Sequence, residues 1–203
     1  MPSEAHADFE KAYAALEQFE GGYANNSYDK GGETYKGISR KFWPNWQGWP
    51  IIDAAKVHSS FAESARAFSK HLAQIDGLND LVKQYYFDVW WAPLQFCALP
   101  SDIIAELFEQ SVNLGRSSSC RYLQKMCNAM NYIDGERIFE KDLVEDGALG
   151  PKTMLAFADV VAYRSNDEIL HVLNVLQAHH YINVASSERN QRQHLSGWLK
   201  RTH

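Results

Sequence analysis

Apolar residues near the start of the chain recur at helical spacing, and the stripe that they form ends on an acid. One face of the predicted helix carries six positions at i, i+3 and i+4 spacing: Phe9, Ala12, Tyr13, Leu16, Phe19 and Glu20. The pattern predicts a helix over residues 4–20, ended by Gly21-Gly22. Glu20 therefore stands where such a helix would bury hydrocarbon.

The next residues change from helical periodicity to turn chemistry. Asn, Asp, Gly and Thr follow one another at turn-like spacing over residues 23–38, which predicts an irregular β-hairpin. Residues 41–50 hold two prolines and a glycine among three tryptophans, so they are expected to form a loop with exposed or half-buried rings. Trp43, Trp46 and Trp49 either pack this loop against the core or stack on sugar faces.

The rest of the chain reads as helices separated by short breaks. Helices are expected at 59–76, 79–91, 101–114, 117–130, shortly after Gly150-Pro151, and over 166–200, with an irregular run at 131–150. Strands and helices do not alternate, and no short repeat is present. The sequence predicts a mainly α fold with one small β-hairpin near the N-terminus.

Composition and charge exclude several classes of partner. The chain has 203 residues, 45% of them apolar and 22% charged, with a net charge of -5. This composition is typical of a globular protein and offers no basic field for nucleic acid. No window approaches the ~18 apolar residues of a membrane span. We expect a monomer, made in the cytoplasm without a signal peptide.

The cysteines and histidines do not form a metal-binding pattern. Cys97, Cys120 and Cys127 lack CxxC or nearby histidine spacing, so we expect reduced core thiols rather than a zinc site or a disulfide. His179 and His180 do not share one face with a carboxylate. No metal and no cofactor are expected.

The acids and glycines after the first helix suggest glycoside chemistry. Burial raises the pKa of a carboxyl, and a general acid for glycoside cleavage needs a carboxyl with a raised pKa. Alternatively, Glu20 could bend out to water at Gly21. Asp29, across a predicted turn, could face the same cleft and stabilise positive charge or hold water, and Thr34 could help to position that water. Alternatively, Asp29 and Thr34 serve the turn itself. Gly32, beside Gly31, allows close backbone approach to a substrate.

These residues resemble a known family. Glu20-Gly21-Gly22-Tyr23, Asp29, Gly31-Gly32, Thr34 and Gly37-Ile38 are similar to the "EGGY…D.GG.T..GI" signature of glycoside hydrolase family 108, whose members are peptidoglycan N-acetylmuramidases. Residues 107–115, "LFEQSVNLG", resemble its "vfDfaVNsG" helix. "CRYLQKM" and "EDGALGPKT" resemble the two halves of a peptidoglycan-binding-like motif. Several short signatures in the family's order make the resemblance specific.

The resemblance implies roles for individual residues. Glu20 would be the catalytic proton donor, with Asp29 and Thr34 beside it. Tyr23 and Gly32 would line the cleft, and Glu109 and Asn113 would form its wall, although Glu109 stands where the family usually has Asp. Without the resemblance, these last two would be a capped helix end before Gly115.

The resemblance also implies an organisation and a function. Residues 1–96 would form a lysozyme-like catalytic region, and residues 97–203 a helical peptidoglycan-binding-like region packed against it. The leading hypothesis is hydrolysis of the β-1,4 bond between N-acetylmuramic acid and N-acetylglucosamine, by a phage endolysin or a secretion-associated muramidase that reaches the wall after holin-type or other export. A lytic transglycosylase and a non-catalytic wall-binding module remain alternatives.

Overall fold

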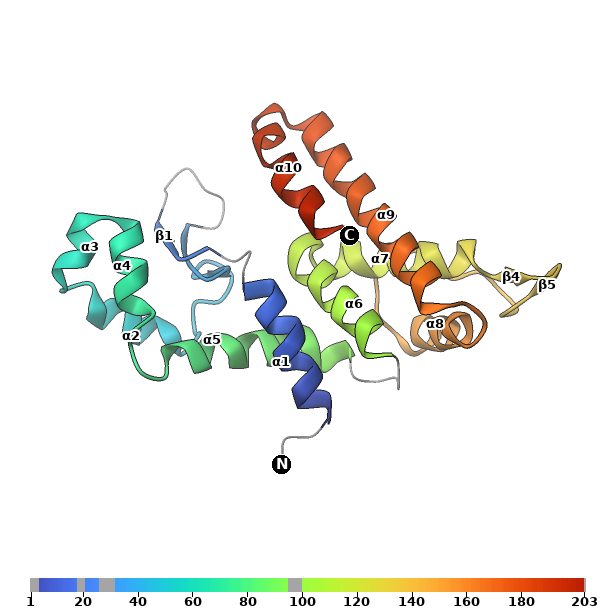
Figure 1. The fold of residues 1–203 in the computed structure, drawn as a ribbon, viewed down its shortest axis with the longest axis horizontal. Helices are drawn as coiled ribbons and strands as arrows, with labels where there is room; N and C mark the ends of the chain where they lie inside the picture. Colours follow the sequence, from blue (N-terminus) through green and yellow to red (C-terminus); the bar gives the residue numbers. More distant parts are fainter. Residues whose placement is uncertain (1–3, 18–20, 26–31, 95–99, 203) are drawn as a thin grey trace. The chain divides into compact units, whose positions relative to one another are not determined.

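The computed structural model describes residues 4–17, 21–25, 32–94 and 100–202 (Figure 1). The chain divides into two compact units, Met1–Ala92 and Pro93–His203. Among the described residues, no helix combines the length and apolar character that a bilayer-spanning segment needs. The assignment of a catalytic role to 1–96 and a binding role to 97–203 stays a prediction.

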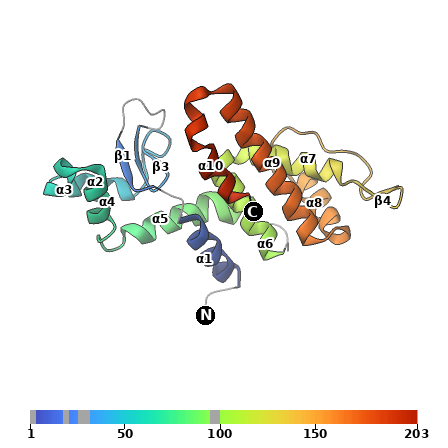
Figure 2. The same cartoon turned by 45° about the horizontal axis from the view of Figure 1, so that its top comes forward.

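The first unit joins a small antiparallel sheet to a set of helices. Its helices are α1 (Glu4–Glu17), α2 (Gly48–Ala55), α3 (Ser59–Glu63), α4 (Ala65–Leu72) and α5 (Leu78–Tyr86), the last continued by the π-helix η1 (Phe87–Trp91) and the 3₁₀ turn η2 (Ala92–Leu94), whose last residues open the second unit. Its strands are β1 (Tyr23–Asn25), β2 (Glu33–Tyr35) and β3 (Ile38–Ser39), in that order across the sheet. In Figure 2 these strands lie beside α4, which contacts β1.

Aromatic side chains fix α1 on α5 and η1. Phe9 and Tyr13, both buried, come from the predicted apolar stripe. The Phe9 ring lies 5.5 Å from that of Trp91, and the Tyr13 ring lies 5.4 Å from that of Tyr86. The stripe therefore buries hydrocarbon as the periodicity predicts, with edge-on and tilted ring pairs that aromatic quadrupoles favour.

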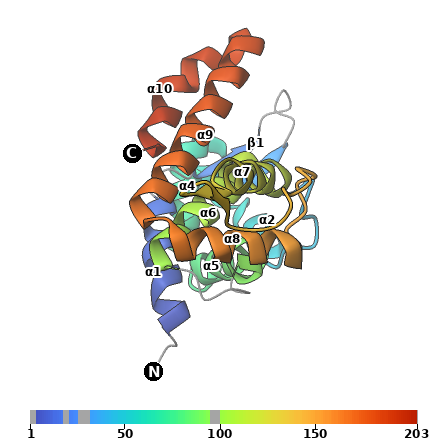
Figure 3. The same ribbon diagram turned by 90° about the vertical axis from the view of Figure 1, so that its right-hand side faces the viewer.

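The second unit is a helical assembly with one small hairpin. Its main elements are α6 (Ser101–Leu114), α7 (Arg116–Ala129), β4 (Tyr132–Ile133), β5 (Glu136–Arg137), α8 (Pro151–Tyr163), α9 (Asn166–Ser187), η3 (Arg189–His194), α10 (Leu195–Trp198) and η4 (Leu199–Arg201). Figure 3 shows α6 and α7 against α9, and each contacts it. After Ser187 the chain turns back, so that α10 lies along α9 and the Trp198 ring is 5.4 Å from that of Tyr181.

The prediction of a mainly α fold with a small β element near the N-terminus is confirmed, and two of the expected helices are corrected. The helix expected over 59–76 is two helices, because Ser64 is extended and its hydroxyl accepts a hydrogen bond from Ala67 N at 3.1 Å, which caps α4. The helix expected over 166–200 ends at Ser187, where Glu188 takes an extended conformation. The polar run that follows lacks apolar periodicity, which is the sequence signal for this break.

The tryptophan loop is also shorter than expected. The helix α2 begins at Gly48, since Pro50 lies in its first turn, where a missing N–H loses no helical hydrogen bond. Trp49 is buried at 1% exposure, contrary to the expectation of an exposed or half-buried ring, while Trp46 is half-buried and Trp43 is exposed. A side chain at Gly48 would lie 2.1 Å from the Trp46 ring, so this position requires glycine.

Candidate active site

Two of the predicted site residues lie on neighbouring strands of the small sheet. Tyr23 in β1 pairs with Tyr35, and Thr34 in β2 pairs with Ala24. Because successive side chains of a strand point to opposite faces, Tyr23 shares a face with Tyr35, and Thr34 lies on the other face. Gly32 precedes β2 with a φ of +64°, a left-handed conformation that favours glycine. Glu20 and Asp29 lie outside the described residues, and their roles stay predictions.

Gly22, in the signature that follows Glu20, lies tightly against α4. A side chain at this position would place its Cβ 2.3 Å from Ser69 Oγ. The same hydroxyl oxygen accepts a hydrogen bond from Tyr23 N at 2.7 Å, and Lys36 N donates to Gly22 O at 3.2 Å. The second glycine of the signature therefore serves close packing, which anchors the start of β1 on both sides.

Tyr23 is a packed residue with an engaged hydroxyl. It is 6% exposed, and its ring meets that of Phe68 edge-on at 4.8 Å. Its hydroxyl donates to Glu33 Oε1 at 2.9 Å. Burial, together with the hydrogen bond to the Glu33 carboxylate, raises the pKa of Tyr23 to about 12. Tyr23 is thus a neutral donor that helps to fix Glu33.

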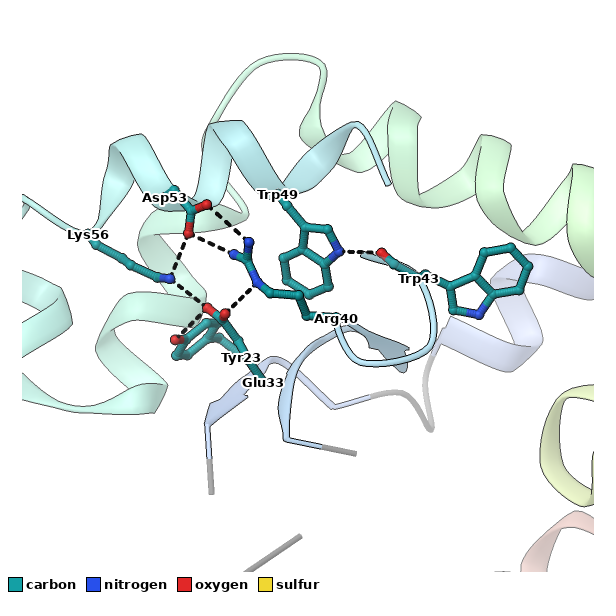
Figure 4. Close-up of polar contacts among 7 residues, drawn as sticks. All are labelled: Tyr23, Glu33, Arg40, Trp43, Trp49, Asp53 and Lys56. Atoms are coloured by element: carbon teal, nitrogen blue, oxygen red, sulfur yellow. Dashed lines mark hydrogen bonds and ion pairs between the residues drawn. The ribbon is translucent and has the colours of Figure 1, made fainter. Parts of the chain in front are cut away.

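Glu33 is the centre of a four-charge network that sequence reasoning missed (Figure 4). Its carboxylate lies 2.6 Å from Arg40 Nε and 2.8 Å from Lys56 Nζ. Both cations also pair with Asp53, each at 2.7 Å. We call Glu33, Arg40, Asp53 and Lys56 the charge quartet. It ties β2 to the segment after β3 and to α2.

No pattern in the sequence predicts the charge quartet, because its members are spread from residue 33 to residue 56. The turn between β2 and β3 makes the first connection, with Lys36 and Gly37 at φ values of +42° and +75°, in the left-handed region that a tight two-residue hairpin uses. Arg40 N then donates to Glu33 O at 2.9 Å. Only this backbone pairing brings the first acid and base side by side.

The quartet predicts a pH dependence of stability. Burial opposes ionisation of Glu33, but hydrogen bonds from Lys56 and Tyr23 and the nearby Arg40 charge outweigh it, so the pKa of Glu33 lies below its usual value. A depressed pKa stabilises the fold above the unfolded-state value of about 4.3, and this stabilisation is lost as the pH falls through the folded-state value. We therefore expect Glu33→Gln to lower the free energy of unfolding at pH 7, with a smaller penalty below about pH 4.

Urea denaturation at pH 7 and at pH 3.5, followed by tryptophan fluorescence, measures this difference. The exposed carboxylate of Glu63, on α3, supplies the matched control Glu63→Gln. An equal penalty for Glu33→Gln at both pH values would show that the Glu33 charge contributes nothing.

Glu109 and Asn113 form a second polar cluster within the second unit. Glu109 Oε2 accepts a hydrogen bond from Gln177 Nε2 at 2.6 Å, and its Oε1 lies 3.4 Å from Arg201 NH1. Asn113 donates to the carboxylate of Glu109, one turn away on α6, and accepts from Arg201. The hydroxyl of Tyr181 accepts a hydrogen bond from Gln177 Nε2 at 2.9 Å.

This cluster gives the longer side chain of Glu109 a structural role. Both of its carboxylate oxygens have protein partners, which come from α6, α9 and the C-terminal η4. Its neighbour Glu106 accepts from Gln110 at 2.8 Å, and burial raises the pKa of Glu106 to about 7. The predicted role of Glu109 and Asn113 in substrate binding stays a prediction.

The peptidoglycan-binding-like motif closes a loop by contacts among its own residues. Gln124, 2% exposed, donates from Nε2 to Asp146, to Ala148 O and to Thr153 at 2.9, 3.2 and 3.1 Å. Its Oε1 accepts from Gly147 N at 2.9 Å. Gln124, Asp146 and Thr153, from the two motif halves, are therefore joined by one set of hydrogen bonds. We call this set the Gln124 clamp, and it holds the loop before α8 against α7.

The cysteines behave as core thiols where they are described. Cys120 and Cys127 are both free and buried, and burial raises the pKa of Cys120 to about 11 and that of Cys127 to about 12. Cys97 lies outside the described residues. Within the part of the chain that the structure describes, no group of three or more His, Cys, Asp or Glu side chains is arranged to hold a metal ion.

Comparison with known families decides the wider assignment. The family model described as glycosyl hydrolase 108 matches residues 13–115, which is half of the chain. The chain belongs to the glycosyl hydrolase 108 family. A second model, described as a "Predicted Peptidoglycan domain", matches residues 119–203. The glycosyl hydrolase 108 region therefore includes α6 with Glu109 and Asn113, and the peptidoglycan-domain region includes the Gln124 clamp.

A solved structure supports the fold of this family member. The structure of SagA from Brucella abortus matches with a TM-score of 0.53 at 19% sequence identity, over 97% of this chain and 94% of that one. The mainly α architecture agrees with a lysozyme-like fold. No curated protein matches the chain. With both family matches, the protein is a glycoside hydrolase that acts on peptidoglycan.

Proposed function

We propose that this glycosyl hydrolase 108 protein is an N-acetylmuramidase, which cleaves the β-1,4 bond between N-acetylmuramic acid and N-acetylglucosamine. The match of the glycosyl hydrolase 108 model over residues 13–115, which contain the whole Glu20-to-Ile38 signature, is the observation that carries the proposal. Within that signature, β1 and β2 pair on either side of the segment that holds Asp29. Gly22, tightly packed on α4, fixes β1 just after Glu20.

In the proposed reaction, Glu20 protonates the glycosidic oxygen as the bond to the anomeric carbon breaks. Asp29, with Thr34, positions the attacking water or stabilises positive charge at the anomeric carbon. Water supplies the new oxygen at that carbon, and its proton passes to a carboxylate. If the two carboxyl groups lie far enough apart to admit a water, roughly 6.5 Å or more, the product is inverted.

We further propose that the protein works at the cell wall after holin-type or other export, as a phage endolysin or a secretion-associated muramidase. The match to a peptidoglycan domain over residues 119–203 supports action on the wall polymer. A non-catalytic module would bind the wall but release no cleavage products. Analysis of the products therefore distinguishes a muramidase from a wall-binding module.

Mass spectrometry of the soluble products from purified peptidoglycan tests the proposal. A muramidase releases muropeptides that end in reducing N-acetylmuramic acid. A lytic transglycosylase would instead release 1,6-anhydro ends, because the muramoyl 6-hydroxyl replaces water. Reducing N-acetylglucosamine ends, or wall binding with no soluble product on any wall type, would overturn the assignment.

A further inference from the structure

An aromatic side chain lies exposed on the loop that follows the small sheet. Trp43 is 40% exposed and Phe42, just before it, is 66% exposed, whereas Trp49 in the same stretch is 1% exposed. Single exposed apolar residues are common on protein surfaces. Two successive large aromatic residues in one tight turn are a more specific feature, and their contacts show how they are held.

The backbone of Trp43 is held from both sides. Trp43 N donates to Ser39 O at 2.9 Å, and Trp43 O accepts from the buried Trp49 indole Nε1 at 2.7 Å. The same carbonyl lies 3.2 Å from Trp46 N, which donates to it. The Trp43 ring is oriented by an edge-to-face contact with Tyr85, with centroids 5.1 Å apart. The indole is thus oriented without being buried.

The charge quartet connects this loop to the candidate active site. The Arg40 guanidinium pairs with Glu33 on β2 and lies 4.3 Å from the centroid of the Trp49 ring. Trp49 in turn donates to Trp43. In Figure 4 the Trp43 side chain points away from the quartet, while its backbone carbonyl stays bonded to Trp49. One continuous set of contacts therefore links β2 to an outward-pointing indole.

We propose that Trp43 is a carbohydrate-stacking subsite, which takes the apolar face of an N-acetylated hexosamine ring of the glycan strand. Pyranose rings present flat C–H surfaces, and an indole offers the largest aromatic face among the side chains. Because the loop is fixed before binding, little conformational freedom is lost when a sugar stacks on it. The inference deepens the proposed function, since the sugar is taken to be a unit of its substrate.

Phe42 and Lys41 immediately precede Trp43 in the chain. The Lys41 ammonium lies 5.8 Å from the centroid of the Phe42 ring. A cation in the turn that carries Trp43 suits a glycan whose muramic acid units bear lactyl or peptide carboxylates. The ring would supply contact area, and the ammonium would favour an acidic sugar over a neutral one.

Binding to two forms of the wall polymer tests the subsite. Co-sedimentation is measured with intact peptidoglycan and with glycan strands freed of peptide, for the native protein, Trp43→Ala and Trp43→Tyr. We expect Trp43→Ala to weaken binding to both polymers about 5- to 30-fold, which corresponds to the loss of roughly 1 to 2 kcal/mol of contact free energy. Trp43→Tyr, which keeps a ring, is expected to restore most of the affinity.

Val57, exposed at 92% just after α2, supplies the matched control Val57→Ala, which is expected to bind like the native protein. Since Trp43 also contacts Tyr85, a measurement on the unaltered protein accompanies the variants. N-bromosuccinimide oxidation, read by peptide mass spectrometry, should modify Trp43 in the free protein and spare it when glycan strands are bound.

Two results would overturn the subsite. One is equal binding of Trp43→Ala and the native protein to peptide-free strands, with Trp43 oxidised at the same rate whether or not strands are present. The other is a loss confined to intact peptidoglycan, which would make the peptide the ligand. Both readouts measure contact with the polymer and not product release, so a protein that binds the strands without cleaving them would fail the muramidase test and still pass this one.

Discussion

Replacing Glu20 by glutamine is expected to lower the rate of peptidoglycan cleavage by about 10²- to 10⁴-fold, the range that a positioned general acid contributes. Glutamine preserves the size and polarity of the side chain but has no proton to give to the leaving oxygen. The affinity for the wall should stay within about twofold of that of the native protein, because the change removes a proton donor and leaves the contact surface in place. Release of reducing ends, together with co-sedimentation, measures the two effects separately.

Glu17, three residues before Glu20 in the sequence, offers a control. It is an exposed carboxylate whose Oε1 lies 2.7 Å from Lys36 Nζ, and an exposed ion pair of this kind contributes little to stability. Glu17→Gln should therefore cleave peptidoglycan at nearly the native rate. If Glu20→Gln also kept more than half of that rate, Glu20 could not be the acid, and the search would move to another carboxyl.

Replacing Gln124 by methionine is expected to destabilise the second unit by about 2 to 4 kcal/mol. The two side chains have similar shape and volume, so packing changes little. The Gly147 N–H loses its acceptor, and the contacts from Nε2 to Asp146, Ala148 and Thr153 are lost as well. A buried donor left without a partner costs more than the hydrogen bond itself contributed.

Hydrogen exchange followed by mass spectrometry tests this expectation, because it resolves the segment around residues 144–154 from the rest of the chain. Faster exchange should begin there and extend into α8. The adjacent Lys125 is exposed on α7, so Lys125→Met changes a neighbour without touching the clamp. Unchanged exchange in Gln124→Met would mean that the loop is held by other contacts.

Helical periodicity and local breakers predicted the regular part of the fold. The helix expected at 101–114 is α6, with the same bounds, because Pro100 and Gly115 mark its two ends. The break at Ser64 went unseen, since a serine that caps a helix resembles a serine on a helix surface until its φ is known. Sequence spacing alone does not distinguish the two.

The candidate site divides in a similar way. Tyr23, Gly32 and Thr34 could be proposed as site residues because they belong to one short signature whose spacing is visible in the sequence, and their roles stay predictions. The charge quartet was not found, because Glu33 and Lys56 meet only after a strand, a turn and a helix have each adopted their final geometry. Gly22 is a third case. The signature marks this glycine in the sequence, but the close approach of Ser69 on α4, which explains why a glycine is needed, is visible only in the structure.

The balance of charge within the quartet bears on its response to salt. Two acids and two bases sum to zero, so the group adds no net charge to the protein. The pairs that involve Glu33 are 2.6 and 2.8 Å long and partly buried, far shorter than the Debye length of about 8 Å at physiological ionic strength. The small sheet should therefore keep its geometry in dilute electrolyte and at physiological ionic strength alike.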